Sequence, residues 1–69
     1  MMASVGYDRA RKTLEIEFQT GDVYEYFGVP YDVFRALLDA ASMGRFFHAE
    51  IDRVYDFTQV TRTPRRRRR

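Results

Sequence analysis

Residues 23–30 read Val23-Tyr24-Glu25-Tyr26-Phe27-Gly28-Val29-Pro30, and they are the most informative part of the chain about its fold. Four of its first five residues are β-branched or aromatic, a composition typical of a strand. Gly28 and Pro30 then interrupt the strand. Proline suits the first position of a helix, because its φ is already helical and its missing N–H would have no partner there. Eight residues therefore predict a strand, a sharp stop and the start of a helix.

Two further strands are predicted before this stretch. Residues 13–18 alternate between apolar and polar side chains, the pattern of a strand with one buried and one wet face. The inward set is Leu14, Ile16 and Phe18, and the outward set is Thr13, Glu15 and Glu17. Residues 5–7 form a short first strand that is joined to it by a polar turn. Residues 20–22 close a second hairpin, in which Gly21 can adopt a positive φ.

The third strand places its tyrosines on one face. Tyr24 and Tyr26 alternate with Val23, Glu25 and Phe27. Because neighbouring residues of a strand point to opposite faces, the tyrosines and Phe27 cannot all be core unless a bulge intervenes near Gly28. We expect the tyrosines to face inward.

The chain after the stretch predicts two helices and a last strand. Apolar residues recur at helical spacing at Val33, Phe34, Leu37, Leu38 and Ala41. Ser42 is expected to cap a second helix, in which Phe47 and Ile51 lie four residues apart on one side. Tyr55 and Phe57 then alternate with polar residues as a strand. The order βββααβ predicts a small two-layer α+β domain: an antiparallel meander, two short helices on one face, and the last strand at the sheet edge.

Length and composition limit how such a domain is stabilised. The chain has 69 residues, close to the smallest size at which one hydrophobic core suffices. It has no cysteine, so neither a disulfide nor a thiolate metal site can help. Its six Phe and five Tyr must therefore lie mostly in the core. With neither a signal-like N-terminus nor a long apolar run, we expect a soluble cytoplasmic protein.

The formal net charge of +2 is the sum of two opposed parts. Residues 1–61 carry six basic and ten acidic side chains, a net charge of −4. Arg62 and the run Arg65, Arg66, Arg67, Arg68 and Arg69 add six positive charges. We expect a mildly acidic domain over residues 4–60. We expect residues 61–69 to be a disordered arginine-rich tail, because they offer a core no apolar residue.

Two more motifs accompany the Tyr-x-Tyr strand. They are Gly6-Tyr7-Asp8 and Ser42-Met43-Gly44-Arg45-Phe46-Phe47. With them, the chain over roughly residues 4–60 resembles the KTSC domain, a short module found alone in small bacterial proteins and at the C-terminus of some lysyl-tRNA synthetases. The family has no established activity. Its occurrence in lysyl-tRNA synthetases suggests RNA binding.

Tyr24 and Tyr26 are the first candidate site. Two aromatic side chains, two residues apart on one strand face, are how some sheet-based RNA binders stack successive bases. The alternative, which we favour, is that a chain this short needs both rings in its core, with the hydroxyls at the sheet margin.

The turn Ser42, Gly44 and Arg45 is the second candidate. A helix N-terminus presents free N–H groups, Gly44 would let a ligand approach closely, and Arg45 could bind a phosphate oxygen. The alternative is structural: Ser42 caps the helix, and Gly44 allows close packing of the two helices.

The run Arg65–Arg69 is the third candidate and the strongest indication of a partner. Consecutive guanidinium groups on a flexible segment bind phosphate backbones without reading sequence. The alternatives are that the tail serves solubility or folds back onto the acidic domain.

Catalysis and metal binding have little support. Glu15 and Glu17 lie on the wet face, and His48 is the only histidine, whereas a zinc site needs three or four ligands. We predict no catalytic residue, metal or cofactor. The sequence favours a small non-enzymatic binding module, for RNA or another nucleic acid or alternatively for a protein partner. We expect a monomer with no membrane partner.

Overall fold

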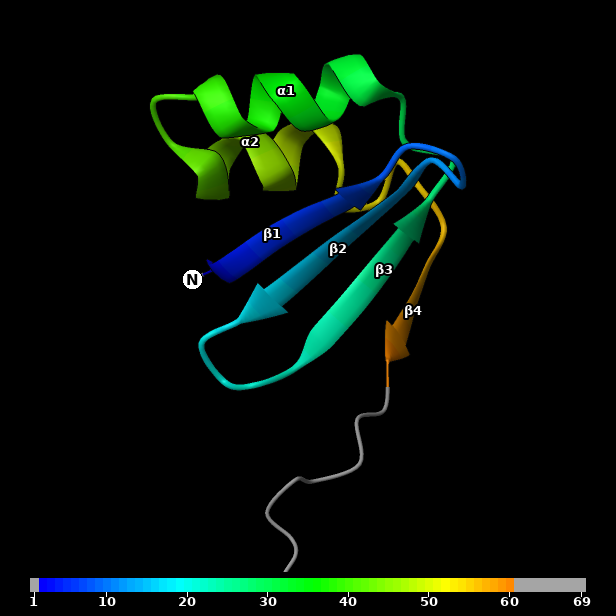
Figure 1. Ribbon diagram of the computed structural model, residues 1–69. Helices are drawn as coiled ribbons and strands as arrows, with labels where there is room; N and C mark the ends of the chain where they lie inside the picture. The colour runs from blue at the N-terminus through cyan, green and yellow to red at the C-terminus, as the bar shows by residue number, and fades with distance from the viewer. Residues whose placement is uncertain (1, 61–69) are drawn as a thin grey trace, which may run out of the picture.

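The computed structural model describes residues 2–60 and shows a two-layer α+β domain (Figure 1). A four-stranded antiparallel sheet has the order β1-β2-β3-β4, and two helices lie on one side of it. The strands are β1 (Met2–Asp8), β2 (Thr13–Phe18), β3 (Val23–Phe27) and β4 (Phe57–Val60), and the helices are α1 (Tyr31–Asp39) and α2 (Met43–Glu50). The predicted fold class and the order βββααβ are confirmed. The predicted tail, residues 61–69, lies outside the described residues.

The first two strands share the longest ladder of the sheet, with a register shift between Met2 and Ser4. β1 is longer than the predicted strand over residues 5–7, and Val5 lies opposite Ile16. Leu14 and Ile16 are fully buried, as their alternation predicts, and Phe18 is partly buried against the same core. Thr13 was expected on the wet face but is also buried. Its hydroxyl donates to the Arg11 carbonyl oxygen at 3.1 Å, so the buried polar group is satisfied by the turn beside it.

The β2–β3 hairpin confirms the predicted turn and strand faces. Gly21 has a φ of +96°, a conformation that side chains with a Cβ rarely adopt. The β2–β3 pairing runs without a register shift and places Tyr24 opposite Ile16 and Tyr26 opposite Leu14. Both tyrosines therefore face the helices, and Phe27 lies on the outer face, where it is 37% exposed.

The first helix begins one residue later than predicted. Pro30 is its N-cap, with an extended ψ of 151°, and its carbonyl accepts hydrogen bonds from the backbone of Val33 and Phe34. Leu37 is fully buried, but Leu38, which was expected on the apolar face, is 44% exposed. Among the described residues, neither helix is long and apolar enough to cross a membrane.

The second helix and the last strand complete the core. Ser42 is the N-cap of α2, as predicted, and Phe47 and Ile51 are buried under the helix. Tyr55 packs against the core but precedes β4, which begins at Phe57. β4 pairs with β3 at the sheet edge, as predicted. The core cluster is Leu14, Ile16, Tyr26, Val29, Leu37, Phe47 and Ile51.

Candidate binding cleft between the sheet and the second helix

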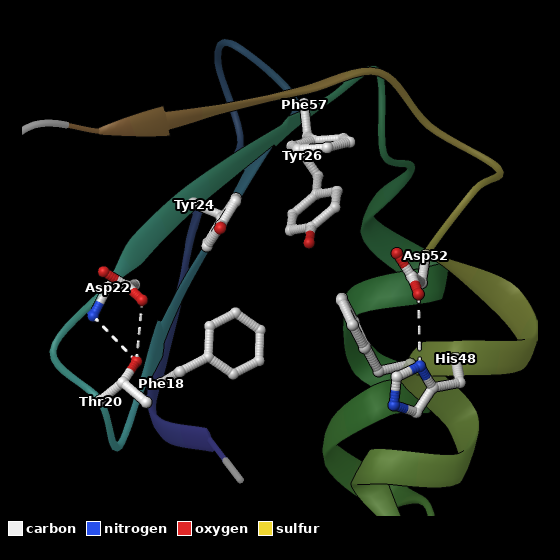
Figure 2. Close-up of a pocket in the computed structure, with 9 residues that line it drawn as sticks. Phe18, Thr20, Asp22, Tyr24, Tyr26, His48, Asp52 and Phe57 are labelled. Atoms are coloured by element: carbon white, nitrogen blue, oxygen red, sulfur yellow. Dashed lines mark hydrogen bonds and ion pairs between the residues drawn. The ribbon is translucent and has the colours of Figure 1, made fainter.

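A cleft of about 430 Å³ lies between strands β2–β4 and helix α2 (Figure 2). We call it the aromatic cleft. Its aromatic lining is Phe18, Tyr24, Tyr26, Phe47 and Phe57, and its polar lining is Thr20, Asp22, His48 and Asp52. The volume lies within the range of small-ligand sites in proteins. Two other clefts among the described residues are smaller, at about 260 and 290 Å³.

The rings of the aromatic cleft are arranged around Tyr26. Its ring centroid lies 5.4 Å from that of Phe47, edge to face, and 5.5 Å from that of Phe57. Tyr24 lies 6.5 Å from Tyr26 and 5.7 Å from Phe57. Tyr26 is only 3% exposed, whereas Phe57 is 54% exposed. The cleft therefore has a packed aromatic floor and an accessible aromatic wall on β4.

The Tyr26 hydroxyl points into the cleft (Figure 2). Within residues 2–60 it makes no hydrogen bond, unlike the Tyr7 hydroxyl, which donates to the Val29 carbonyl oxygen. Burial raises the pKa of Tyr26 to about 12, and the charge of Asp52 and the neighbouring Tyr24 add to the shift. The phenol is therefore neutral at ordinary pH, and its oxygen is open to a ligand that donates a hydrogen bond.

Two carboxylates border the aromatic cleft. Asp52, which follows α2, lies 3.2 Å from the His48 ring nitrogen Nδ1. Asp22, in the β2–β3 turn, accepts hydrogen bonds from the Thr20 hydroxyl at 3.0 Å and from the Gln59 amide at 3.2 Å. The lining that residues 2–60 supply contains neither lysine nor arginine. Unless His48 is protonated, the cleft carries only negative charge, which favours cationic over anionic ligands.

The structure places Tyr24 and Tyr26 together in this cleft. Tyr26 is a core residue, as the alternative interpretation of the pair held, and its ring is covered by Phe47 and Phe57. Tyr24 is half-buried and reaches the cleft wall. Each interpretation therefore holds for one residue of the pair: the Tyr26 ring belongs to the core, and the Tyr24 ring is partly accessible in the cleft.

Ser42, Gly44 and Arg45 lie at the opposite end of α2 from Asp52. The Ser42 hydroxyl accepts a hydrogen bond from the Arg45 backbone N–H at 3.3 Å, which is a capping contact. A Cβ at Gly44 would meet no atom within 4 Å, so the expectation that this glycine permits close packing of the helices is wrong. None of the three lines the aromatic cleft; Gly44 instead borders a smaller, apolar cleft beside β1. The candidate residues Arg65–Arg69 lie outside the described residues.

Of the nine residues that line the cleft, the sequence indicated only Tyr24 and Tyr26 as site residues. It did not indicate the polar residues Thr20, Asp22, His48 and Asp52 or the exposed Phe57. Phe57 was recognised only as part of a strand, and His48 and Asp52 carried a weak local signal, since their spacing of four residues pairs them at a helix end. Among the described residues, no group of three or more histidine and acidic side chains is placed to hold a metal ion.

The fold places the chain among small two-layer α+β modules, in which a three-stranded meander and a fourth edge strand carry two helices on one face. The KTSC domain profile matches residues 1–55, so the chain belongs to the KTSC domain family. A crystal structure of a KTSC domain protein from Yersinia pestis has the same fold, with a TM-score of 0.82 and 34% sequence identity. The match covers 87% of this chain and 84% of that one.

Two kinds of relatives match the same region. An uncharacterised protein of Stutzerimonas stutzeri is 47% identical over 47 residues, which are 68% of this chain and 66% of that protein. A lysine–tRNA ligase of Trichormus variabilis is 40% identical over 55 residues, 80% of this chain but only 10% of the ligase. A ligase of Nostoc punctiforme is 42% identical over the same share. The family thus occurs in small proteins and as a minor part of lysine–tRNA ligases.

Proposed function

We propose that this KTSC domain protein is a non-enzymatic, cytoplasmic module that associates with RNA, with Arg65–Arg69 contacting phosphates. The separation of charge carries the proposal: residues 1–61 have a net charge of −4, and the last eight residues carry six arginines. Such a run neutralises several phosphates at once and releases their counterions. The relatives that are named as lysine–tRNA ligases support RNA as the nucleic acid.

The folded domain contributes little attraction for phosphate. The aromatic cleft is bordered by Asp22 and Asp52, and the outer sheet face carries Glu15, Glu17 and Glu25. These carboxylates repel a phosphate backbone. Most of the affinity is therefore expected from the arginine run, and it is expected to be independent of base sequence.

Two sites on the domain are left for secondary contacts with RNA. Tyr24 and the more exposed Phe57 offer ring faces on which a base could stack, while Tyr26 supports them from below. The capped turn at Ser42 leaves Arg45 exposed and Gly44 uncrowded, which suits a single phosphate contact. These contacts would position RNA on the domain rather than supply the affinity.

A titration of the full-length protein with a short single-stranded RNA at two salt concentrations tests the proposal. With about five phosphates neutralised, the log-log slope of affinity against salt is expected near −3.5, at about 0.7 per contact. The matched variant keeps the chain length and replaces each residue of Arg65–Arg69 by glutamine, and it is expected to lose nearly all binding. Equal and salt-insensitive affinity in both proteins would contradict the proposal and move the site to Tyr24, Tyr26 and Arg45.

A protein-interaction module is the second candidate function. The observation that favours it is the aromatic cleft, which is open to solvent and presents Phe57 with 54% of its surface exposed. Exposed aromatic side chains beside a polar rim are typical of surfaces that bind other proteins. Retention of a protein partner after nuclease treatment, together with loss of that partner on Phe57→Ala, would favour this function over RNA association.

A further inference from the structure

The aromatic cleft has the chemistry of a cation-binding site. Phe57 and Tyr24 present accessible ring surface, and an aromatic ring attracts a cation to its face. Asp52 stands on the helix side of the cleft and Asp22 on the sheet side (Figure 2). Aromatic faces between carboxylates are the combination that holds guanidinium or ammonium groups, because ring and carboxylate both attract positive charge.

The Tyr26 hydroxyl is an independent indication of a ligand. The Tyr26 side chain is buried, its hydroxyl points into the cleft, and this hydroxyl has no hydrogen-bond partner within residues 2–60. A hydroxyl at the cleft surface without a protein partner is available to a ligand. A ligand with several N–H donors in one plane would satisfy this oxygen and reach the Asp52 carboxylate in the same pocket. Guanidinium has that arrangement of donors, and ammonium does not.

We propose that the aromatic cleft binds an arginine side chain from residues 61–69 of the same chain. The position at which the described chain ends favours this occupant. β4 ends at Val60, which pairs with Val23, the residue after Asp22. Gln59 pairs with Tyr24 and donates to Asp22. The described chain therefore ends at the Asp22 end of the cleft.

The chain beyond Val60 is long enough to return to the cleft. Its β4 wall extends from Gln59 back to Phe57, a separation of two residues or about 7 Å along a strand. Arg65 lies five residues beyond Val60, and five extended residues span at most about 16 to 18 Å. An arginine side chain at that position can reach every part of the wall. Because the arginines are tethered, their effective concentration is expected near the millimolar range, so even a weak contact becomes populated.

The domain already contains one contact of the proposed kind. The Arg9 guanidinium carbon lies 4.3 Å from the centroid of the Tyr31 ring, at the other end of the sheet. The net charge of −4 on residues 1–61 against the six arginines that follow favours the same arrangement in the cleft. The inference does not depend on RNA binding. If both hold, RNA and the cleft compete for the same arginines.

The test is an NMR comparison of two full-length chains without RNA. One is the wild type, and in the other every arginine of the segment is replaced: Arg62→Gln, Arg65→Gln, Arg66→Gln, Arg67→Gln, Arg68→Gln and Arg69→Gln. The ring signals of Tyr24 and Phe57 are expected to differ between the chains, and those of Phe27 and Tyr31 to coincide. In the wild type, raising the salt concentration should move the cleft signals toward their positions in the glutamine chain, because salt screens the attraction.

Matched variants assign the effect to the cleft. Asp52→Asn in the full-length wild type is expected to shift Phe57 toward its position in the glutamine chain. Asp39→Asn, at an exposed aspartate outside the cleft, should leave it unchanged. Superimposable cleft signals in the wild-type and glutamine chains would overturn the proposal. So would equal responses to the two aspartate variants.

Titration with free arginine distinguishes two possible occupants of the cleft: an arginine of residues 61–69 and an arginine side chain of another molecule. Arginine hydrochloride, compared with sodium chloride at equal ionic strength, is expected to perturb Tyr24 and Phe57 more strongly in the glutamine chain than in the wild type. If both chains respond equally and their starting spectra coincide, the cleft binds arginine from another molecule, and the assignment to residues 61–69 fails. No perturbation in either chain would overturn the cation site itself.

Discussion

Tyr26 and Phe57 lie opposite each other across strands β3 and β4, with ring centroids 5.5 Å apart, yet one ring is buried and the other is 54% exposed. The difference arises because Phe47 of α2 covers Tyr26 but does not cover Phe57. The same strand pair therefore contributes both to the hydrophobic core and to an accessible aromatic wall. This arrangement lets a very small domain keep an open cleft without exposing its core.

The core prediction concerns Ile16, which is fully buried and lies between Val5 and Tyr24 in the sheet. Ile16→Ala is expected to lower the free energy of unfolding by about 2 to 5 kcal/mol, a large part of the stability of a domain this small. Ile16→Val should cost only about 0.5 to 1.5 kcal/mol. Urea unfolding of both variants measures the difference. Equal midpoints would show that this face of β2 does not form the core.

The pH prediction concerns Tyr26, whose pKa is raised by burial from its ordinary value of 10.0 to about 12. Between these pH values the unfolded chain has lost the phenolic proton and the native chain keeps it. The native state therefore binds more protons, and stability falls as pH rises from about 10 to about 12. Thermal melts across this range check the slope.

Tyr26→Phe is the matched control for this pH dependence. It removes the ionisable hydroxyl and keeps the ring contacts with Phe47 and Phe57. The fall in melting temperature above pH 10 is expected to become shallower than in the wild type. Parallel curves for the two proteins would assign the alkaline loss of stability to other groups.

The start of α2 gives two substitutions of opposite sign. Ser42→Ala removes the hydroxyl that accepts from the Arg45 N–H and is expected to cost about 1 kcal/mol. Gly44→Ala adds a Cβ that meets no atom within 4 Å and lowers the entropy of the unfolded chain, so it should stabilise the domain by about 0.4 to 1 kcal/mol. Melting temperatures measure both effects. A destabilised Gly44→Ala variant would show that the glycine has a conformational role.

The last prediction concerns Asp52 and tests whether RNA binding competes with the proposed binding of an arginine in the cleft. If an arginine of residues 61–69 occupies the cleft in half to nine-tenths of the molecules, Asp52→Asn should free it and raise RNA affinity about 2- to 10-fold. Removing one negative charge also weakens repulsion, and the exposed Asp39→Asn variant controls for that smaller effect. Fluorescence anisotropy with a labelled single-stranded RNA measures all three proteins. Equal gains in RNA affinity for Asp52→Asn and Asp39→Asn would show that the gain comes only from the loss of a negative charge and not from release of an arginine.

The order of the elements, the inward tyrosines and the cap at Ser42 could be predicted from the sequence, since each depends on residues close together in the chain. The alternation of Leu14 and Ile16 and the break at Gly28 and Pro30 are local patterns of this kind. The cleft could not be predicted in this way, because it forms only when the elements pack together. The pairing of β4 with β3 brings Phe57 next to Tyr26. The position of α2 over the sheet places Asp52 across the cleft from Asp22. Contacts between residues some thirty positions apart depend on how whole elements pack, and no local periodicity encodes that packing.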